Sequence, residues 1–163
     1  YSMYNVGPTT PAEWKVVWRR MDRSLQAAAV GPIDDPHLGR RPVIPQETCV
    51  FVACNDADEA HYLAAFLNSV PVRFVVSHYS LAGSKGFGSP HILDVVAVPR
   101  FDRGNGDHRR LAALGRKASD ADTTALREAV LVEIDAVVAR LWRLSQSAVA
   151  TMRSWICADA KGG

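Results

Sequence analysis

The chain has 163 residues, which is enough for one domain with its own hydrophobic core. Hydrophobic residues make up 48% of it and charged residues 22%, a balance typical of globular proteins that argues against a disordered chain. The formal net charge of +2 is too small to indicate a nucleic-acid partner by itself. No apolar run approaches the length that spans a bilayer, so we expect no membrane association.

The cationic residues are mostly arginine, since 15 of the 19 are Arg and four are Lys. Arginine suits bidentate contacts to phosphate and guanine, although a GC-rich genome explains much of such an excess. The three cysteines lack metal-ligand or disulfide spacing, and Cys49 and Cys54 are predicted to be small core residues in a reducing cytoplasm. The first residues show no signal peptide, and we expect the chain to be a piece of a longer protein.

The first predicted strand covers 14–21 and alternates in part. Trp14, Val16 and Trp18 share one face and predict that it is buried. Lys15 and Arg19 lie on the opposite face with Val17. Those two cations could supply flanking contacts to phosphates, or they could be ordinary charges on a solvated strand face.

Two further strands are predicted at 25–30 and 48–54. The intervening segment 31–45 holds four prolines and two glycines, which indicates a loop. The strand at 48–54 is apolar on both faces, so we expect it in the centre of the sheet.

A short helix is predicted next, with Asn55 or Asp56 as its N-cap and an apolar stripe between Tyr62 and Leu67. We expect it to end at Asn68–Ser69, because Pro71 cannot continue a helix. Residues 72–79 then predict a strand. A glycine-rich loop, 80–91, follows this strand, and a short apolar segment then leads to Pro99.

The composition changes after Pro99, and no proline follows it. Leu111 and Leu114 predict a short helix. Apolar residues at helical spacing then predict a long amphipathic helix over 126–142, and Ser145 could be the N-cap of a last helix. The apolar stripe of these helices fits an intramolecular core, and packing against another domain is the alternative.

We therefore predict an α+β fold, with a small mixed β-sheet and a packed helix followed by a C-terminal helical segment. The expected division is 1–103 for the α/β region and 104–163 for the helical region, together one compact fragment.

Motifs for catalysis are missing from the sequence. There is no HExxH, no GxSxG, no P-loop and no complete dinucleotide fingerprint. What remains is the loop 80–91, whose glycines allow close backbone approach to phosphates and in which Lys85 is the only full positive charge. A connector without a ligand is the alternative interpretation of this loop.

Several motifs resemble the C-terminal specificity (target-recognition) region of adenine-N6 DNA methyltransferases of the TaqI-like and type IIG restriction–modification group, and more loosely the target-recognition modules of type I specificity subunits. The resemblance covers nearly the whole chain and is carried, in chain order, by Lys15–Arg19, Val43–Gln46, Cys49–Val52, Tyr62–Ser69, Phe87–Leu93, Val96–Phe101, Ile134–Asp135 and Leu141–Ser145. Ala148 departs from the family tail, where an acidic residue would complete a capping box after Ser145.

The resemblance implies a DNA target-recognition domain that is not catalytic by itself, with double-stranded DNA and the methyltransferase domain of its parent protein as partners. It also implies S-adenosylmethionine as the cofactor of that catalytic domain, outside this fragment, and a place in the cytoplasm. The alternatives are a protein-interaction domain that docks a partner subunit and, more weakly, a small standalone enzyme. The residues that we predict to contact DNA are Lys15, Arg19, Ser80, Ser84, Lys85, Phe87, Ser89 and His91.

Overall fold

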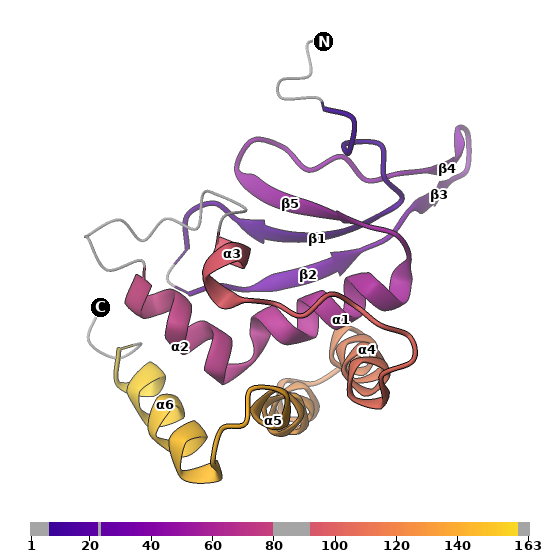
Figure 1. Ribbon diagram of the computed structural model, residues 1–163. Helices are drawn as coiled ribbons and strands as arrows, with labels where there is room; N and C mark the ends of the chain where they lie inside the picture. The colour runs from indigo at the N-terminus through magenta and orange to yellow at the C-terminus, as the bar shows by residue number, and fades with distance from the viewer. Residues whose placement is uncertain (1–6, 23, 80–91, 160–163) are drawn as a thin grey trace.

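The structure is a computed structural model that describes residues 7–22, 24–79 and 92–159 of the chain. It has an α+β fold, which confirms the predicted class (Figure 1). A small sheet and helix α1 form one half, and helices α4, α5 and α6 lie below α1 in the view of Figure 1. No helix in these ranges is both long and apolar enough to cross a membrane.

The main sheet has three strands in the order β2-β1-β5. These strands are β1 (Trp14–Arg19), β2 (Ala27–Val30) and β5 (Cys49–Cys54). Both pairings are antiparallel, so the mixed sheet that we expected is absent from the described residues. The expectation that 48–54 is central was also wrong, because β1 lies between the other two strands and β5 is at an edge.

The segment 31–45 contains a second, two-stranded sheet rather than only a loop. Strands β3 (Ile33–Asp35) and β4 (Gly39–Arg41) pair antiparallel, with Asp34 opposite Arg40. Asp35 Oδ1 accepts hydrogen bonds from the backbone N–H groups of His37 and Leu38, and this closes the turn. The prolines indicated the turns of this segment correctly. The pairing of β3 with β4 was not predicted, because no strong local sequence pattern indicates two strands there.

Helix α1 (Ala57–Asn68) is the central element of the fold, and its predicted start is confirmed. Asp56 is the N-cap and accepts from the backbone N–H groups of Asp58 and Glu59. All residues from Ala60 to Leu67 are buried. A helix that is buried all round needs neighbours on every side, and α1 contacts β1, β2 and α4.

Residues 70–79 form helix α2 (Val70–Tyr79), so the strand predicted for 72–79 was wrong. The chain breaks helical geometry only at Ser69, and Pro71 lies in the first turn of the new helix, where no backbone N–H is needed. Val72 and Val76 are one helical turn apart and both are buried. The short apolar segment before Pro99 is likewise helical and forms α3 (Ile92–Val96).

Three helices complete the chain: α4 (Gly106–Ser119), α5 (Thr124–Leu141) and α6 (Gln146–Asp159). They match the helices predicted after Pro99, and Ser145 Oγ accepts from the Ala148 N–H at the start of α6. Helix α4 packs on α1, α5 packs on α4, and α6 contacts α2. Most of the predicted stripe of α5 is buried, but Leu126 is 43% exposed.

Candidate nucleic-acid interface

Six of the eight residues predicted to contact DNA lie outside the described part of the chain. They are Ser80, Ser84, Lys85, Phe87, Ser89 and His91. Helix α2 ends at Tyr79 and α3 begins at Ile92, so these two helices flank the segment. The role of the loop in DNA binding stays a prediction.

Lys15 does not lie on a solvent-facing strand surface. Its exposed fraction is 0%, and its Nζ donates to the carbonyl oxygen of Ala12. The same Nζ lies 5.9 Å from the centroid of the Phe51 ring on the neighbouring strand. Burial lowers the pKa of Lys15. In this structure the Lys15 ammonium is not exposed, because it lies against the Ala12 carbonyl and the Phe51 ring, and its contact with phosphate stays a prediction.

Arg19, at the end of β1, is exposed as predicted. Its Nη1 lies 3.8 Å from Oδ2 of Asp22, and 76% of its side chain is accessible to solvent. An ion pair this exposed contributes little to stability, so Arg19 can exchange Asp22 for another anion.

A group of exposed cations lines a groove along α4, which we call the α4 groove. It has a volume of about 650 Å³. Arg109, Ala112, Ala113 and Arg116 face it, at the spacing that places side chains on one side of a helix. The remaining lining residues are Asp58, Phe101, Arg103, Lys117, Asp120 and Leu126.

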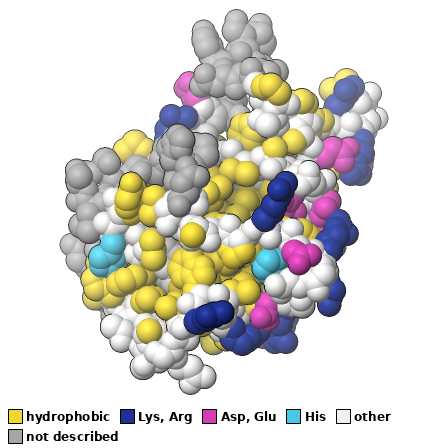
Figure 2. Space-filling model, in the orientation of Figure 1, with side chains coloured by type: hydrophobic (Ala, Val, Ile, Leu, Met, Phe, Trp, Pro, Cys, Tyr) yellow, Lys and Arg dark blue, Asp and Glu magenta, His cyan; other side chains and the backbone are white. Residues whose placement is uncertain are grey.

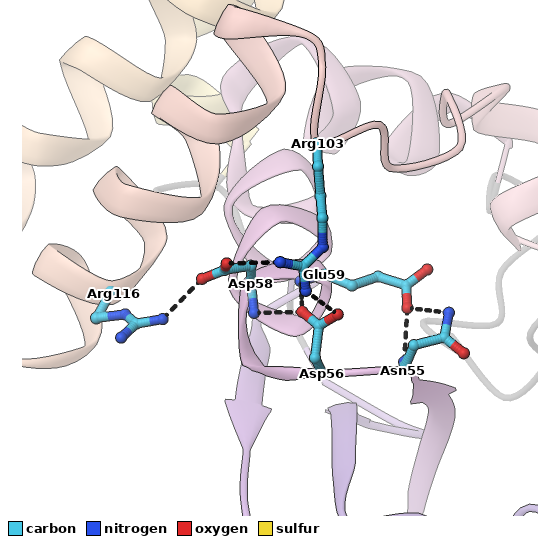
Figure 3. Close-up of polar contacts among 6 residues, drawn as sticks. All are labelled: Asn55, Asp56, Asp58, Glu59, Arg103 and Arg116. Atoms are coloured by element: carbon cyan, nitrogen blue, oxygen red, sulfur yellow. Dashed lines mark hydrogen bonds and ion pairs between the residues drawn. The ribbon is translucent and has the colours of Figure 1, made fainter.

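Ion pairs connect the start of α1 to Arg103, which precedes α4, and to Arg116 in α4 (Figure 3). Arg103 Nη2 lies 2.6 Å from Asp56 Oδ2, and Arg116 Nη2 lies 2.9 Å from Asp58 Oδ1. Arg103 Nη1 also lies 4.0 Å from Asp58 Oδ2. The two arginines therefore approach Asp58 from the two ends of α4.

Asp56 combines two roles, because its Oδ1 caps α1 while its Oδ2 binds Arg103. Burial raises the pKa of its carboxyl, but hydrogen bonds from the Glu59 N–H and from Arg103 outweigh this effect and the net pKa is lowered. Asn55 and Glu59 complete the turn, since Glu59 Oε2 accepts from the Asn55 N–H at 2.6 Å. The start of α1 is thus a fixed support for Arg103 (Figure 3).

Cations outnumber carboxylates among the lining residues themselves, but Asp56 and Glu133 beside the groove also pair with lining cations. Arg103, Arg109, Arg116 and Lys117 line it together with Asp58 and Asp120. Arg109 makes a hydrogen bond to the carbonyl oxygen of Arg103, and Lys117 lies 3.8 Å from Glu133. Figure 2 shows Lys and Arg side chains gathered on this side of the molecule, with Asp and Glu among them and a largely hydrophobic area beside them. Among the four cations only Arg109 has no carboxylate partner in the described part of the chain, so it is the side chain of this groove that can most readily bind an anionic ligand.

The apolar residues of this helix predicted a place in the core, and its basic face was not among the predicted DNA contacts. The spacing of Arg109, Ala112, Ala113 and Arg116 was a usable signal, because positions i, i+3, i+4 and i+7 share one side of a helix. Arg103 had no such signal, since its place beside Asp56 depends on how α4 packs on α1.

The β3–β4 hairpin carries a second group of exposed residues and projects from the sheet (Figure 1). Arg41 is exposed, and Arg40 pairs with Glu13 at 3.3 Å. Ile33 and Leu38 are 56% and 63% exposed, which is unusual for residues of their size. This hairpin offers mixed cationic and apolar contacts.

Comparisons of the chain with protein-family models, with curated proteins and with solved structures found no match. The resemblance to target-recognition regions of adenine-N6 methyltransferases therefore rests on the residue motifs alone.

Proposed function

We propose that this chain is the DNA target-recognition domain of an adenine-N6 DNA methyltransferase in a restriction–modification or phage-defence system, and that it has no catalytic activity by itself. The observation that carries the proposal is the α4 groove, which is lined by four exposed cations. Three of them pair with exposed or half-exposed carboxylates, and such ion pairs contribute little to stability, so phosphate oxygens can replace the carboxylates. The order of the sequence motifs supports it.

The groove suits the backbone of a nucleic acid. Arginine and lysine at its rim can bind phosphate oxygens, while the small side chains of Ala112 and Ala113 let the sugar–phosphate chain approach α4 closely. Such contacts position a domain on DNA without specifying a sequence. Base reading is assigned in this proposal to the loop 80–91, and transfer of the methyl group from S-adenosylmethionine to the catalytic domain of the parent protein.

The test is a titration of labelled duplex DNA by fluorescence anisotropy at several salt concentrations. Arg109→Ala and Lys117→Ala should each weaken binding of all duplex sequences alike and reduce the slope of log affinity against log salt by about one, because each removes one phosphate contact. Arg143→Ala is the control, since Arg143 is exposed after α5 and is not among the residues that line the groove.

Affinity that is independent of salt, or equal losses in Arg109→Ala and Arg143→Ala, would contradict a phosphate-binding role for this groove. If these substitutions weakened the binding of one duplex sequence only, base reading would be assigned to α4 instead of the loop.

Docking of a protein partner is the second candidate function, and the exposed Ile33 and Leu38 of the β3–β4 hairpin favour it. In that case duplex DNA does not bind the chain, and Leu38→Asp abolishes its association with the methyltransferase domain of the parent protein. Retained association in Leu38→Asp would remove the hairpin as the docking surface.

A further inference from the structure

Asp58, the second residue of α1, lies between two arginines, one from the segment before α4 and one from its last turn. Its Oδ1 is 2.9 Å from Nη2 of Arg116, and its Oδ2 is 4.0 Å from Nη1 of Arg103. Figure 3 shows both arginine side chains pointing toward this carboxylate. Because Asp58 also lines the α4 groove, its carboxylate occupies the place in that groove where two guanidinium groups converge.

Both members of the Arg116–Asp58 pair are accessible to solvent. The side chain of Arg116 is 51% exposed and that of Asp58 is 46% exposed. An ion pair this exposed contributes little to stability, so the guanidinium group can exchange its partner while the helices stay folded. Phosphate oxygens accept hydrogen bonds from arginine in the same way as carboxylate oxygens. A DNA phosphate and the Asp58 carboxylate are therefore alternative partners for Arg116.

Arg103 is held by a different carboxylate. Its Nη2 lies 2.6 Å from Oδ2 of Asp56, whose Oδ1 accepts from the backbone N–H groups of Asp58 and Glu59 and so caps α1. Among the described residues, the Asp58 carboxylate accepts a hydrogen bond only from Arg116. Asp58 can therefore turn away from Arg116 while Asp56 keeps Arg103 in place beside the groove.

We propose that Asp58 competes with the phosphates of duplex DNA for Arg116 and thereby limits the affinity of the α4 groove. In the free protein the carboxylate pairs with Arg116, and a phosphate displaces it on binding. The displaced carboxylate attracts a cation from solution, which offsets part of the counterion release from the DNA. The exchange involves only the DNA backbone, so it weakens the binding of all duplex sequences alike. This inference rests on the proposed DNA binding at the α4 groove and names the residue that limits it.

Titration of labelled duplex DNA by fluorescence anisotropy, at several salt concentrations, tests the competition. Asp58→Asn removes the charge and keeps the shape of the side chain. It should tighten binding about two- to fivefold, the ratio that corresponds to one exposed ion pair. The slope of log affinity against log salt should become steeper by up to about one, because no carboxylate is left to take up a cation. A thermal unfolding curve of the variant checks that α1 is intact, since Asp58 also favours the start of that helix.

Two further comparisons make the test specific. Asp120→Asn removes the same charge from the same groove, but Asp120 has no ion-pair partner in the part of the chain that the structure describes. It should therefore tighten binding less than Asp58→Asn and leave the salt slope unchanged. When Arg116→Ala is already present, adding Asp58→Asn should give no more than the Asp120→Asn gain, because the cation for which Asp58 competes is missing.

The possible failures of this inference and of the proposed function are distinguishable. Wild-type protein that does not bind duplex DNA would overturn both. If the wild type binds DNA and Arg109→Ala weakens that binding, two results would overturn the inference alone. One is that Asp58→Asn binds no more tightly than Asp120→Asn. The other is that the gain from Asp58→Asn is undiminished in Arg116→Ala, which would show that the carboxylate acts through its charge and not through Arg116.

Discussion

Gly115 shows how one residue controls the distance between two helices. It lies in α4, where alanine normally stabilises a helix by roughly 1 kcal/mol relative to glycine. A Cβ here would lie 2.2 Å from a backbone oxygen of α1, which no side-chain rotation can relieve. We expect Gly115→Ala to lower the free energy of unfolding by about 1–3 kcal/mol, because overpacking outweighs the gain in propensity.

Urea denaturation measures this effect, and Gly106→Ala is the matched control on the same helix. No atom lies within 4 Å of a Cβ built at Gly106, so that change should be neutral or slightly stabilising. Equal effects at the two positions would show that α4 and α1 are less closely packed than described.

Helix α2 depends on a residue that is distant in the sequence. The Val70 N–H, at its first residue, donates to Asp135 Oδ1 at 2.7 Å, while Asp135 Oδ2 lies 2.6 Å from Arg153 Nη2 on α6. Asp135 therefore links the start of α2 to α5 and α6. Asp135→Ala should lower the unfolding free energy by about 2–3 kcal/mol, the size of a lost charge-assisted hydrogen bond, since Arg153 is partly exposed.

The protonation of Asp135 gives this link a pH dependence. Burial raises the pKa of its carboxyl by more than the Val70 N–H, Arg153 and Arg73 lower it. The folded state therefore binds the proton more tightly than the unfolded state. As the pH falls through this raised pKa, wild type should gain stability relative to Asp135→Asn. Denaturation curves of both proteins across the acidic range check this, and a constant difference would contradict the raised pKa.

The whole molecule is held together by the burial of α1 between the sheet and the C-terminal helices. Tyr62 illustrates this, because its ring centroid lies 4.9 Å from that of His108 in α4 and its hydroxyl donates to the Pro99 carbonyl. Phe66 meets Trp142 at a centroid distance of 5.6 Å. A chain cut after residue 103 would expose this side of α1.

We therefore expect a fragment of residues 1–103 not to fold cooperatively, whereas the full chain unfolds in one transition. Circular dichroism during heating of the two proteins measures the difference. A sharp thermal transition in the fragment would show that the α/β region is an independent unit.

Sequence patterns predicted the elements whose causes are local. The Asp56 cap, the alternation of β1, the long helix α5 and the cap at Ser145 all follow from residues within a few positions of one another. The α+β class was therefore predictable, as was the order of strands followed by helices. The basic face of α4 could also have been predicted from the helical spacing of its arginines, but it was not.

Tertiary contacts decided the rest. Residues 70–79 have the β-branched and aromatic composition of a strand, yet they form a helix because Asp135 binds its first N–H and Val72 and Val76 pack on one side. The alternation of β1 places Lys15 on the side predicted to face solvent, but neighbouring residues cover it. The α4 groove combines residues of α4 with Asp58 of α1 and therefore depends on the packing of these two helices. The sequence by itself determined where the local elements begin and end, whereas the long-range contacts determined which strand is central, which cations reach solvent and where a ligand can bind.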